Sequence, residues 1–136
     1  MITIDTREQK PWSLTDAWSG VSFTVATLST GDYSNGNVII ERKSIPDICN
    51  CCGKSKQRFW NELARGFDYL IIEGDEQDIT AHLKKRHSRM SQKYILKCLH
   101  EIRDNFGVEV ILAGSREDAA RIALEILGGT YAAKVN

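Results

Sequence analysis

Two carboxylates and a lysine in the first third of the chain have the types and spacing needed to hydrolyse a phosphodiester bond. Asp32 lies in the segment 30–37, which is dense in turn-forming residues, and Glu41 and Lys43 end a short apolar strand at 38–43. Side chains two apart on a strand point to the same face, so Glu41 and Lys43 should lie side by side. Because Asp32 precedes Glu41 across a hairpin, we expect the two carboxylates to converge.

Paired carboxylates of this kind suit a hard divalent cation. Mg²⁺ prefers oxygen ligands, and two carboxylates with water and phosphate oxygens would complete its coordination. We therefore expect Asp32 and Glu41 to hold Mg²⁺, for which Mn²⁺ would substitute. Lys43 would orient and help to deprotonate a water molecule, or stabilise charge at the phosphorus atom. Taken alone, however, a Glu-Arg-Lys segment at a strand end is more often solvated surface.

The elements that would position this group begin with strands. Alternation of apolar and polar residues predicts strands at 1–6 and 21–28, and a short apolar run that ends in charges predicts another at 38–43. In the second of these, Val21, Phe23 and Val25 would share one face.

The rest of the chain alternates helix and strand. We expect helices at 45–52 and 54–65, a buried strand at 69–73, a helix capped by Ser91 and ended by Gly107, a strand at 108–112, and a last helix from Ser115 to Gly128. This order predicts an α/β fold with a mixed sheet flanked by helices. The strands 69–73 and 108–112 should be parallel neighbours joined by a helical crossover.

Composition bounds the class of protein. A chain of 136 residues with 42% hydrophobic residues suits a single domain with an ordinary core. Its 18 basic and 18 acidic residues balance, so overall charge gives no argument for a polyanionic partner. No apolar run approaches the roughly 20 residues that span a bilayer, and the N-terminus does not resemble a signal peptide. We expect a soluble protein of the cytoplasm with no membrane partner.

The four cysteines, three of them within 49–52, have poor spacing for a disulfide framework. We interpret them as reduced, small, partly buried side chains. A zinc site that combines them with His82 or His87 is the alternative, although no paired Cys-x-x-Cys arrangement supports it.

The motifs, taken in order, resemble the nuclease domain of the XPF/Mus-type (ERCC4-like) structure-specific endonucleases, within the restriction-endonuclease-like superfamily. The resemblance covers almost the whole chain. It rests on Ile4-Asp5-Thr6-Arg7-Glu8, Gly31-Asp32-Tyr33, Glu41-Arg42-Lys43-Ser44 with Asp47, Arg58, Leu70-Ile71-Ile72-Glu73, and Ser115 with Ala119-Ala120. It implies a restriction-endonuclease-like mixed sheet and a Mg²⁺-dependent endodeoxyribonuclease that cuts branched or flapped DNA or single-strand/double-strand junctions.

The resemblance also implies roles for single residues. Asp32 and Glu41 would be the metal ligands and Lys43 would act on the attacking water or the transition state. Asp5 would be a further catalytic carboxylate beside them, supporting the site or holding a second metal. Its position after a strand also fits a turn former.

Three more residues would support the site. Glu8 and Arg42 would complete the acidic and phosphate-contacting rim, although strand alternation turns Arg42 away from Glu41 and equally favours an ion-pair role. Asp47 matches the family motif and could equally cap the following helix.

Contacts with DNA would come from two basic clusters. The segment 82–97 has no acidic residue and holds Lys84, Lys85, Arg86, Arg89, Lys93 and Lys97, and a second cluster consists of Lys54, Lys56 and Arg58. Such clusters neutralise phosphates and make binding salt-sensitive. A solvated helix surface is the alternative for the first cluster, and Trp60 is interpreted as a core residue rather than a base-stacking platform.

Relatives of this type usually carry tandem helix–hairpin–helix modules, for which 136 residues leave no room. We therefore expect one nuclease domain at 1–136, with a homodimer or a protein partner as possible additions, and a phage-like compact genome as its source. Two other functions stay open. One is a non-catalytic DNA-binding subunit of a nuclease complex, and the other is an α/β interaction module with a coincidental charged hairpin.

Overall fold

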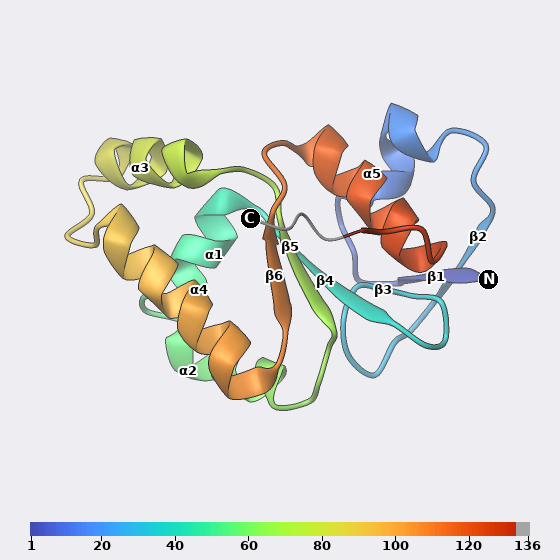
Figure 1. The fold of residues 1–136 in the computed structure, drawn as a ribbon, viewed down its shortest axis with the longest axis horizontal. Coiled ribbons are helices and arrows are strands. Elements are labelled where there is room, and N and C mark those ends of the chain that lie inside the picture. The colour runs from blue at the N-terminus through green and yellow to red at the C-terminus, as the bar shows by residue number, and fades with distance from the viewer. Residues whose placement is uncertain (133–136) are drawn as a thin grey trace.

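The computed structural model describes residues 1–132, and within them six strands form one sheet in the order β2-β1-β3-β4-β5-β6 (Figure 1). The strands are β1 (Ile2–Asp5), β2 (Phe23–Ala26), β3 (Tyr33–Ser34), β4 (Ile39–Lys43), β5 (Tyr69–Ile72) and β6 (Glu109–Leu112). The helices are α1 (Ile45–Cys51), α2 (Lys56–Leu63), α3 (Glu76–Lys85), α4 (Gln92–Phe106) and α5 (Arg116–Leu127), with short 3-10 helices η1 (Trp12–Leu14) and η2 (Asp16–Trp18). The predicted α/β class with a mixed, helix-flanked sheet is confirmed.

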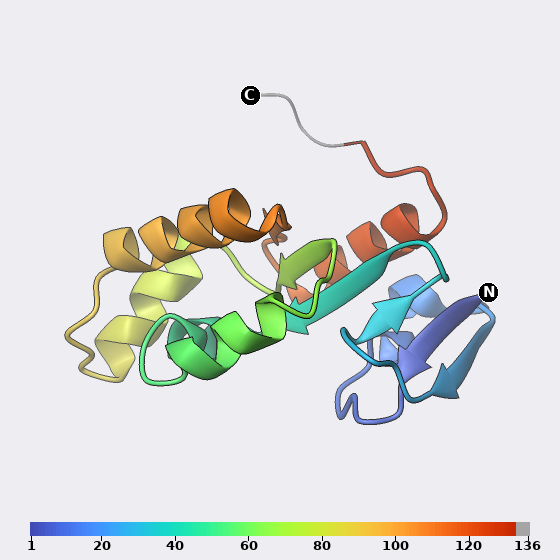
Figure 2. The same ribbon diagram turned by 90° about the horizontal axis from the view of Figure 1, so that it is seen from below.

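Helices lie on both sides of the sheet (Figure 2), and each face has its own hydrophobic core. Helices α1 to α4 pack on one face, and α5 packs with η1 and η2 on the other. Strand β5 contributes to both cores because alternate side chains point to opposite faces. Leu70 and Ile72 join the first core, and Ile71 joins the second. This burial on both faces explains why the segment 69–73 is apolar without alternation.

Strands β4, β5 and β6 run parallel, and helices join them. The pairing of β5 with β6 confirms the predicted parallel neighbours with a helical crossover. Parallel strands have their carboxyl ends at the same end of a sheet. Lys43, the last residue of β4, pairs in register with Ile72, the last residue of β5, and the Glu73 N–H donates to the Lys43 carbonyl over 2.9 Å. The residues that follow β4 and β5 therefore meet at one edge.

A tight hairpin joins β3 to β4 and brings Asp32 back to Glu41. Tyr33 pairs with Ile40 in antiparallel register, and the Asp32 N–H donates to the Ile40 carbonyl over 2.8 Å. At the turn, the Asn35 side-chain oxygen accepts from the N–H groups of residues 37 and 38. The predicted convergence of the hairpin strands is thus explained by ordinary turn chemistry.

The predicted strand at 21–28 is shorter than expected, and the prediction of a strand over the whole segment was wrong. Strand β2 covers Phe23–Ala26 and lies at the edge of the sheet, parallel to β1. All its residues are exposed, with Val25 at 59%. Val21 precedes the strand and packs partly against the second core, whereas Phe23 and Val25 are exposed.

Three short helices were not predicted. Helix α3 carries only two buried apolar residues, Ile79 and Leu83, so its periodicity is weak, although Asp75 and Asp78 form a reciprocal capping box at its start. Helices η1 and η2 are too short for a periodic signal, yet they bury Trp12 and Trp18. By contrast, the caps predicted at Ser91, Gly107 and Ser115 are all present.

All four cysteines are buried with free thiols, as interpreted from their spacing. Burial raises the pKa values of Cys49 and Cys51 to about 11, which keeps these thiols protonated at neutral pH. Residues 1–132 contain no group of three or more His, Cys, Asp or Glu side chains placed to hold a metal ion alone, so the zinc alternative gains no support. None of the helices in the same range is long and apolar enough to cross a membrane.

Candidate active site

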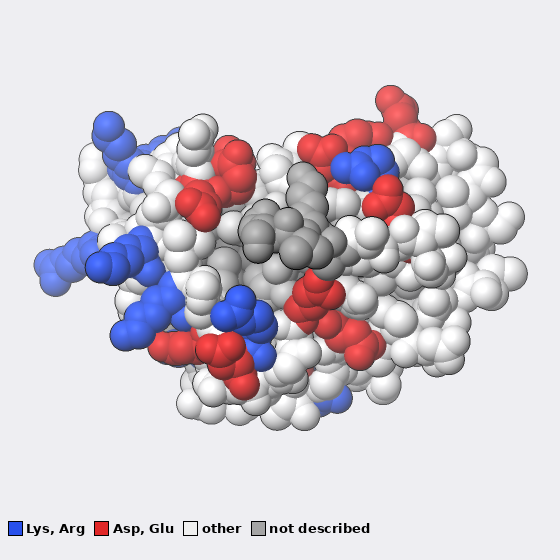
Figure 3. All heavy atoms as spheres, viewed as in Figure 1, with Lys and Arg blue, Asp and Glu red and all other residues white. Residues whose placement is uncertain are grey.

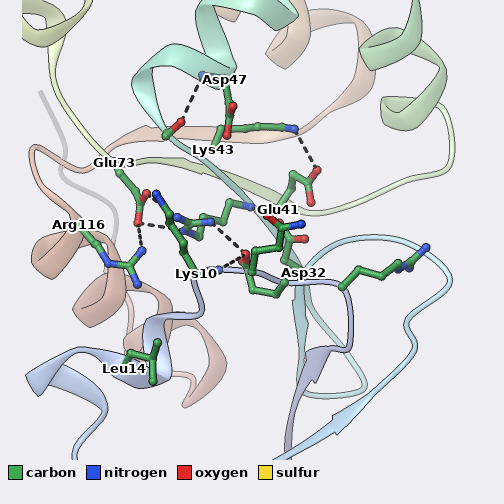
Figure 4. A pocket seen from close by; sticks show the side chains of 13 residues that line it. Lys10, Leu14, Asp32, Glu41, Lys43, Asp47, Glu73 and Arg116 are labelled. Carbon is green, nitrogen blue, oxygen red and sulfur yellow. Dashed lines mark hydrogen bonds and ion pairs between the residues drawn. The ribbon is translucent and has the colours of Figure 1, made fainter.

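A cleft with a volume of about 790 Å³ opens at the sheet edge where β4 and β5 end (Figure 4). It is lined by the sequence-predicted residues Asp32, Glu41, Lys43, Glu8, Arg42 and Asp47, and also by Arg7, Gln9, Lys10, Leu14, Ser44, Glu73 and Arg116. The cleft is thus surrounded by the β3–β4 hairpin, the segment after β1, and the ends of β4 and β5. The structure brings most of the predicted group together.

Alternation along β4 separates the charged tripeptide into two groups. Glu41 and Lys43 share a face, and the Lys43 Nζ lies 3.8 Å from Glu41 Oε2 and 5.2 Å from the centre of the Phe59 ring on α2. Arg42 lies on the opposite face, as alternation predicts, and pairs with Glu8 and Glu73. The cleft collects both groups because they lie at the end of the strand.

Asp32 and Glu41 form a pair of carboxylates with too little positive charge around them. Figure 4 places them next to each other, and Asp32 Oδ2 accepts a hydrogen bond from the Arg42 backbone N–H over 2.8 Å. Burial, reinforced by the neighbouring Asp32 carboxylate, raises the pKa of Glu41 to about 9. The pair therefore retains a proton at neutral pH unless another cation replaces it.

Lys43 is the cation that faces this pair. Burial acts against its charge, but nearby acidic groups such as Glu41 and Glu62 outweigh burial, and the pKa of Lys43 is raised. The amine therefore stays protonated at neutral pH. A protonated lysine can stabilise negative charge on a phosphate but cannot accept a proton. Of the two expected roles of Lys43, this favours charge stabilisation over deprotonation of a water molecule.

Arg42 lies at the centre of a buried ion-pair network. Its Nη1 donates to Glu8 Oε1 over 3.1 Å, its Nε donates to Glu73 Oε2 over 3.1 Å, and its Nη2 lies 3.0 Å from Glu73 Oε1. The side chains of Arg42, Glu8 and Glu73 are 11%, 6% and 7% exposed. Arg42 therefore packs as the predicted ion-pair residue while its backbone N–H holds Asp32.

Two charged residues of the site, Glu73 and Arg116, had no role assigned from the sequence, although Glu73 belongs to one of the motifs. Glu73 Oε2 accepts from the Trp12 Nε1–H over 2.8 Å and from Arg116 Nη1 over 3.1 Å. A signal for Glu73 existed, because a polar residue at the carboxyl end of a buried parallel strand occupies the usual ligand edge of such sheets. Arg116 had no comparable signal, since only the packing of α5 brings it to the cleft.

The charge of the site and its carboxylate oxygens without hydrogen-bond partners indicate whether the site fits a divalent cation. The Asp32–Glu41 pair shares excess negative charge, and Glu8 Oε2 is a buried oxygen without a hydrogen-bond partner among residues 1–132. Burial and the nearby Asp32 carboxylate raise the pKa of Glu8 as well. These carboxylate oxygens are the donor type that Mg²⁺ or Mn²⁺ prefers, and water or substrate oxygens would complete the coordination, so the residues fit such an ion.

Asp5 lies beside the Asp32–Glu41 pair, but both of its carboxylate oxygens already accept hydrogen bonds. It lines a smaller hollow together with Asp32 and Glu41, and its Oδ2 accepts from Arg7 Nε over 2.9 Å while its Oδ1 accepts from the Leu28 N–H over 2.8 Å. The hydrogen bond from Arg7 lowers the pKa of Asp5. This geometry favours a bracing role over direct metal contact, because a metal would have to displace Arg7.

Asp47 does not cap the following helix. The cap of α1 is Ser44, whose side chain accepts the Asp47 N–H over 3.3 Å. Asp47 is exposed on the rim of the cleft, so of its two predicted roles the capping role was wrong.

The predicted DNA-binding residues lie on two surfaces. Lys84, Lys85, Arg86, Arg89 and Lys93 are exposed around the end of α3 and the start of α4, where Figure 3 shows basic side chains gathering at the left. In the second cluster, Lys54 and Arg58 are exposed, whereas Lys56 pairs with Glu101 over 3.7 Å and lies over the Trp60 ring. Trp60 itself packs against the core, as interpreted from the sequence.

Comparison with known proteins identifies the family of this chain. A family model described as the ERCC4 domain matches residues 4–126. The chain belongs to the ERCC4 domain family. Its residues at 31–33, 41–44 and 47, on which the resemblance rested, line or adjoin the cleft.

Solved structures resemble the fold of this ERCC4 domain. XPF from Aeropyrum pernix aligns with a TM-score of 0.72 at 20% identity, and the same protein in complex with DNA aligns with 0.72 at 19%. Each match covers 93% of this chain and 62% of the other, so the chain spans less than two thirds of those proteins. Among curated protein sequences, none matches this one.

Proposed function

We propose that this ERCC4 domain is a divalent-metal-dependent DNA endonuclease. The observation that carries the proposal is the partly buried Asp32–Glu41 pair, which lines an open cleft with the Lys43 amine 3.8 Å from Glu41. Two carboxylates that resist joint ionisation, next to a cation that stays charged, form a poor structural ion pair and a good binding site for a divalent ion.

Each residue of the site would have its own role in hydrolysis. Asp32 and Glu41 would hold Mg²⁺, with Mn²⁺ as a substitute, and the ion would supply charge to polarise the scissile phosphate and to acidify an attacking water. Lys43 would stabilise the negative charge that builds up on the phosphate oxygens. The hydrogen bond from the Arg42 N–H fixes Asp32 Oδ2, so one ligand oxygen is oriented before any ion arrives.

We propose branched or flapped DNA, or a single-strand/double-strand junction, as the substrate. The resemblance to structure-specific endonucleases supports this choice, and so does the DNA complex of the similar XPF from Aeropyrum pernix. The exposed lysines and arginines of α3 and α4 offer a second contact surface outside the cleft, which a bent or branched substrate would use more fully than a straight duplex. A homodimer or a protein partner would extend this surface further.

The test is cleavage of end-labelled flap, fork, duplex and single-stranded DNA in Mg²⁺ or Mn²⁺. Asp32→Asn and Glu41→Gln should each reduce the rate by about a hundredfold or more, as losses of charge-stabilising groups do. Asp104→Asn, at a side chain 67% exposed on α4, is the matched control and should cut normally. If the folded wild type binds these substrates but never cuts them, a non-catalytic DNA-binding subunit replaces the proposal. If it neither binds nor cuts, both ideas fail.

A further inference from the structure

A second hollow adjoins the cleft at the carboxyl ends of β4 and β5. It has a volume of about 540 Å³ and shares Ser44, Glu73 and Arg116 with the cleft. Its far wall is helix α3, which contributes His82 and Lys85. The two hollows together form one groove from the carboxylate pair to the basic end of α3, and Arg116 lies where they join.

Two contacts fix the Arg116 guanidinium at this junction. Its Nη1 donates to Glu73 Oε2 over 3.1 Å, and its Nη2 donates to the Pro11 carbonyl over 2.9 Å. Figure 4 shows the side chain pointing at its neighbour Glu73. Glu73 is rigid in turn, because its side chain is only 7% exposed and also accepts from Trp12 and Arg42.

The positively charged Arg116 guanidinium has N–H donors that no partner among the described residues uses. An arginine has five N–H donors, and in the described part of the chain Arg116 uses them for these two partners only. Its side chain is 36% exposed, so the remaining donors can reach a ligand in the groove. Glu73 also pairs with Arg42, so its carboxylate is shared between two arginines.

We infer that Arg116 binds a backbone phosphate of the DNA strand that runs from the scissile position into the second hollow, toward Lys85. The inference rests on the proposed function and adds a substrate contact to it. A planar guanidinium that is already oriented suits two parallel hydrogen bonds to phosphate, and little side-chain entropy is lost on binding. Glu73 is then a positioning residue that aims Arg116 and does not touch the substrate.

The competing interpretation is a purely structural ion pair between α5 and the sheet. It predicts that substitution of Arg116 lowers stability and leaves the contacts with phosphate unchanged. A stability measurement alone therefore does not separate the two ideas, whereas the salt dependence of DNA binding does.

The first experiment measures fork-DNA binding against salt concentration, with Ca²⁺ in place of Mg²⁺. Arg116→Gln should weaken binding about tenfold at low salt, as the loss of a charged hydrogen bond does, and lower the salt slope by about one phosphate. Arg116→Lys should keep the slope but lose affinity, because a lysine retains the charge without the fork. The matched control is Arg121→Gln on the same helix, whose side chain is 56% exposed and pairs with Glu125, and it should bind like the wild type.

The second experiment starts from the wild-type protein, so its first result does not depend on the folding of a variant. Single phosphates of the fork are replaced one at a time by neutral methylphosphonates. One position beside the cut should weaken binding by the wild type, and the same position should add no further loss in Arg116→Gln.

The outcomes separate this inference from the proposed function. Unchanged affinity and slope in Arg116→Gln, or fully additive losses at every methylphosphonate position, would overturn the role of Arg116 while nuclease activity stands. Arg116-dependent binding by a protein that never cuts would support the phosphate contact and reject the nuclease. If the wild type does not bind DNA, both fall.

Discussion

At the scale of single residues, the candidate site holds more negative charge than its surroundings neutralise. Asp32 and Glu41 face one lysine, and Glu8 carries an oxygen with no partner in residues 1–132. Burial makes this arrangement unfavourable, since charged groups lose hydration there. Such strain is common where function rather than stability selects the residues. Relief of the strain should therefore stabilise the fold and remove the activity.

Glu41→Gln should stabilise the metal-free protein and stop cleavage. The pKa of Glu41 is raised from 4.5 to about 9, so the folded state disfavours the ionised form. The penalty is absent below pH 4.5 and grows as pH rises toward 9, and the advantage of the variant should grow in the same direction, to roughly 1–2 kcal/mol. Urea unfolding at pH 5, 7 and 9 in EDTA measures it. A variant less stable than the wild type at pH 9 would show that Glu41 is a structural residue.

At the scale of elements, short connections position the site more than the long helices do. The end of β1 is tied to the segment after β2 through Asp5, and the β3–β4 hairpin places Asp32 against β4. Each connection is made by a few hydrogen bonds, so single substitutions should move the site without unfolding the sheet.

Asp5→Asn should weaken the first of these connections in a pH-dependent way. The hydrogen bond from Arg7 lowers the pKa of Asp5, so its contribution is present above the ordinary value of 3.8 and is lost as pH falls through the lowered value. We expect a cost of about 1–3 kcal/mol at pH 7 that shrinks toward pH 3. Urea unfolding across this range measures it, with the exposed Asp16→Asn as control. A cost that stays constant down to pH 3 contradicts the ion pair.

Gly31→Ala should displace Asp32, the residue that follows it. Gly31 has φ +76°, and an added Cβ would overlap the Ile39 side chain and lie 3.2 Å from the Ile40 carbonyl oxygen. Gly36 has φ +93° with open space around it, which makes Gly36→Ala the matched control. Both should lose about 1 kcal/mol to backbone strain, and Gly31→Ala should lose about 1–3 kcal/mol more. Cleavage should disappear only in Gly31→Ala. Equal activity of the two variants would mean that crowding at Gly31 does not reach Asp32.

At the scale of the whole molecule, the cleft lies between two separate hydrophobic cores. Glu41 and Lys43 face the core under α1 and α2, while Arg42, Glu73 and Arg116 lie on the side of α5. Ion binding at the carboxyl ends of β4 and β5 is therefore thermodynamically linked to the folding of the entire chain, because each of these two groups of side chains is assembled only when its core is folded.

Mg²⁺ should consequently raise the melting temperature. At ten times its Kd, the ion should add about 1.4 kcal/mol to the free energy of unfolding, or a few degrees in Tm. EDTA should reverse the shift, and Asp32→Asn and Glu41→Gln should abolish it, as thermal scans over a Mg²⁺ series can measure. The same shift in Asp32→Asn would place the ion elsewhere.

The sequence by itself determined the local features of this protein. The apolar run that begins the strand at 38–43, the caps at Ser91 and Ser115, and the apolar run at 70–72 are all short-range signals, and each predicted its element. The turn residues at 30–37 predicted the bend of the hairpin but not the short strand β3 within that segment. The grouping of Asp32, Glu41 and Lys43 followed from the same signals, because a hairpin and one strand suffice to bring them together.

Only the tertiary structure decided what surrounds that group. Glu73 and Arg116 are 43 residues apart, and they meet because parallel strands end at one edge and α5 packs back across it. Likewise, the engagement of Asp5 by Leu28 and the burial of Trp12 against Glu73 depend on contacts between distant segments. Periodicity and spacing report which face a side chain occupies within its own element, and the partner on that face is set by the packing of the elements together.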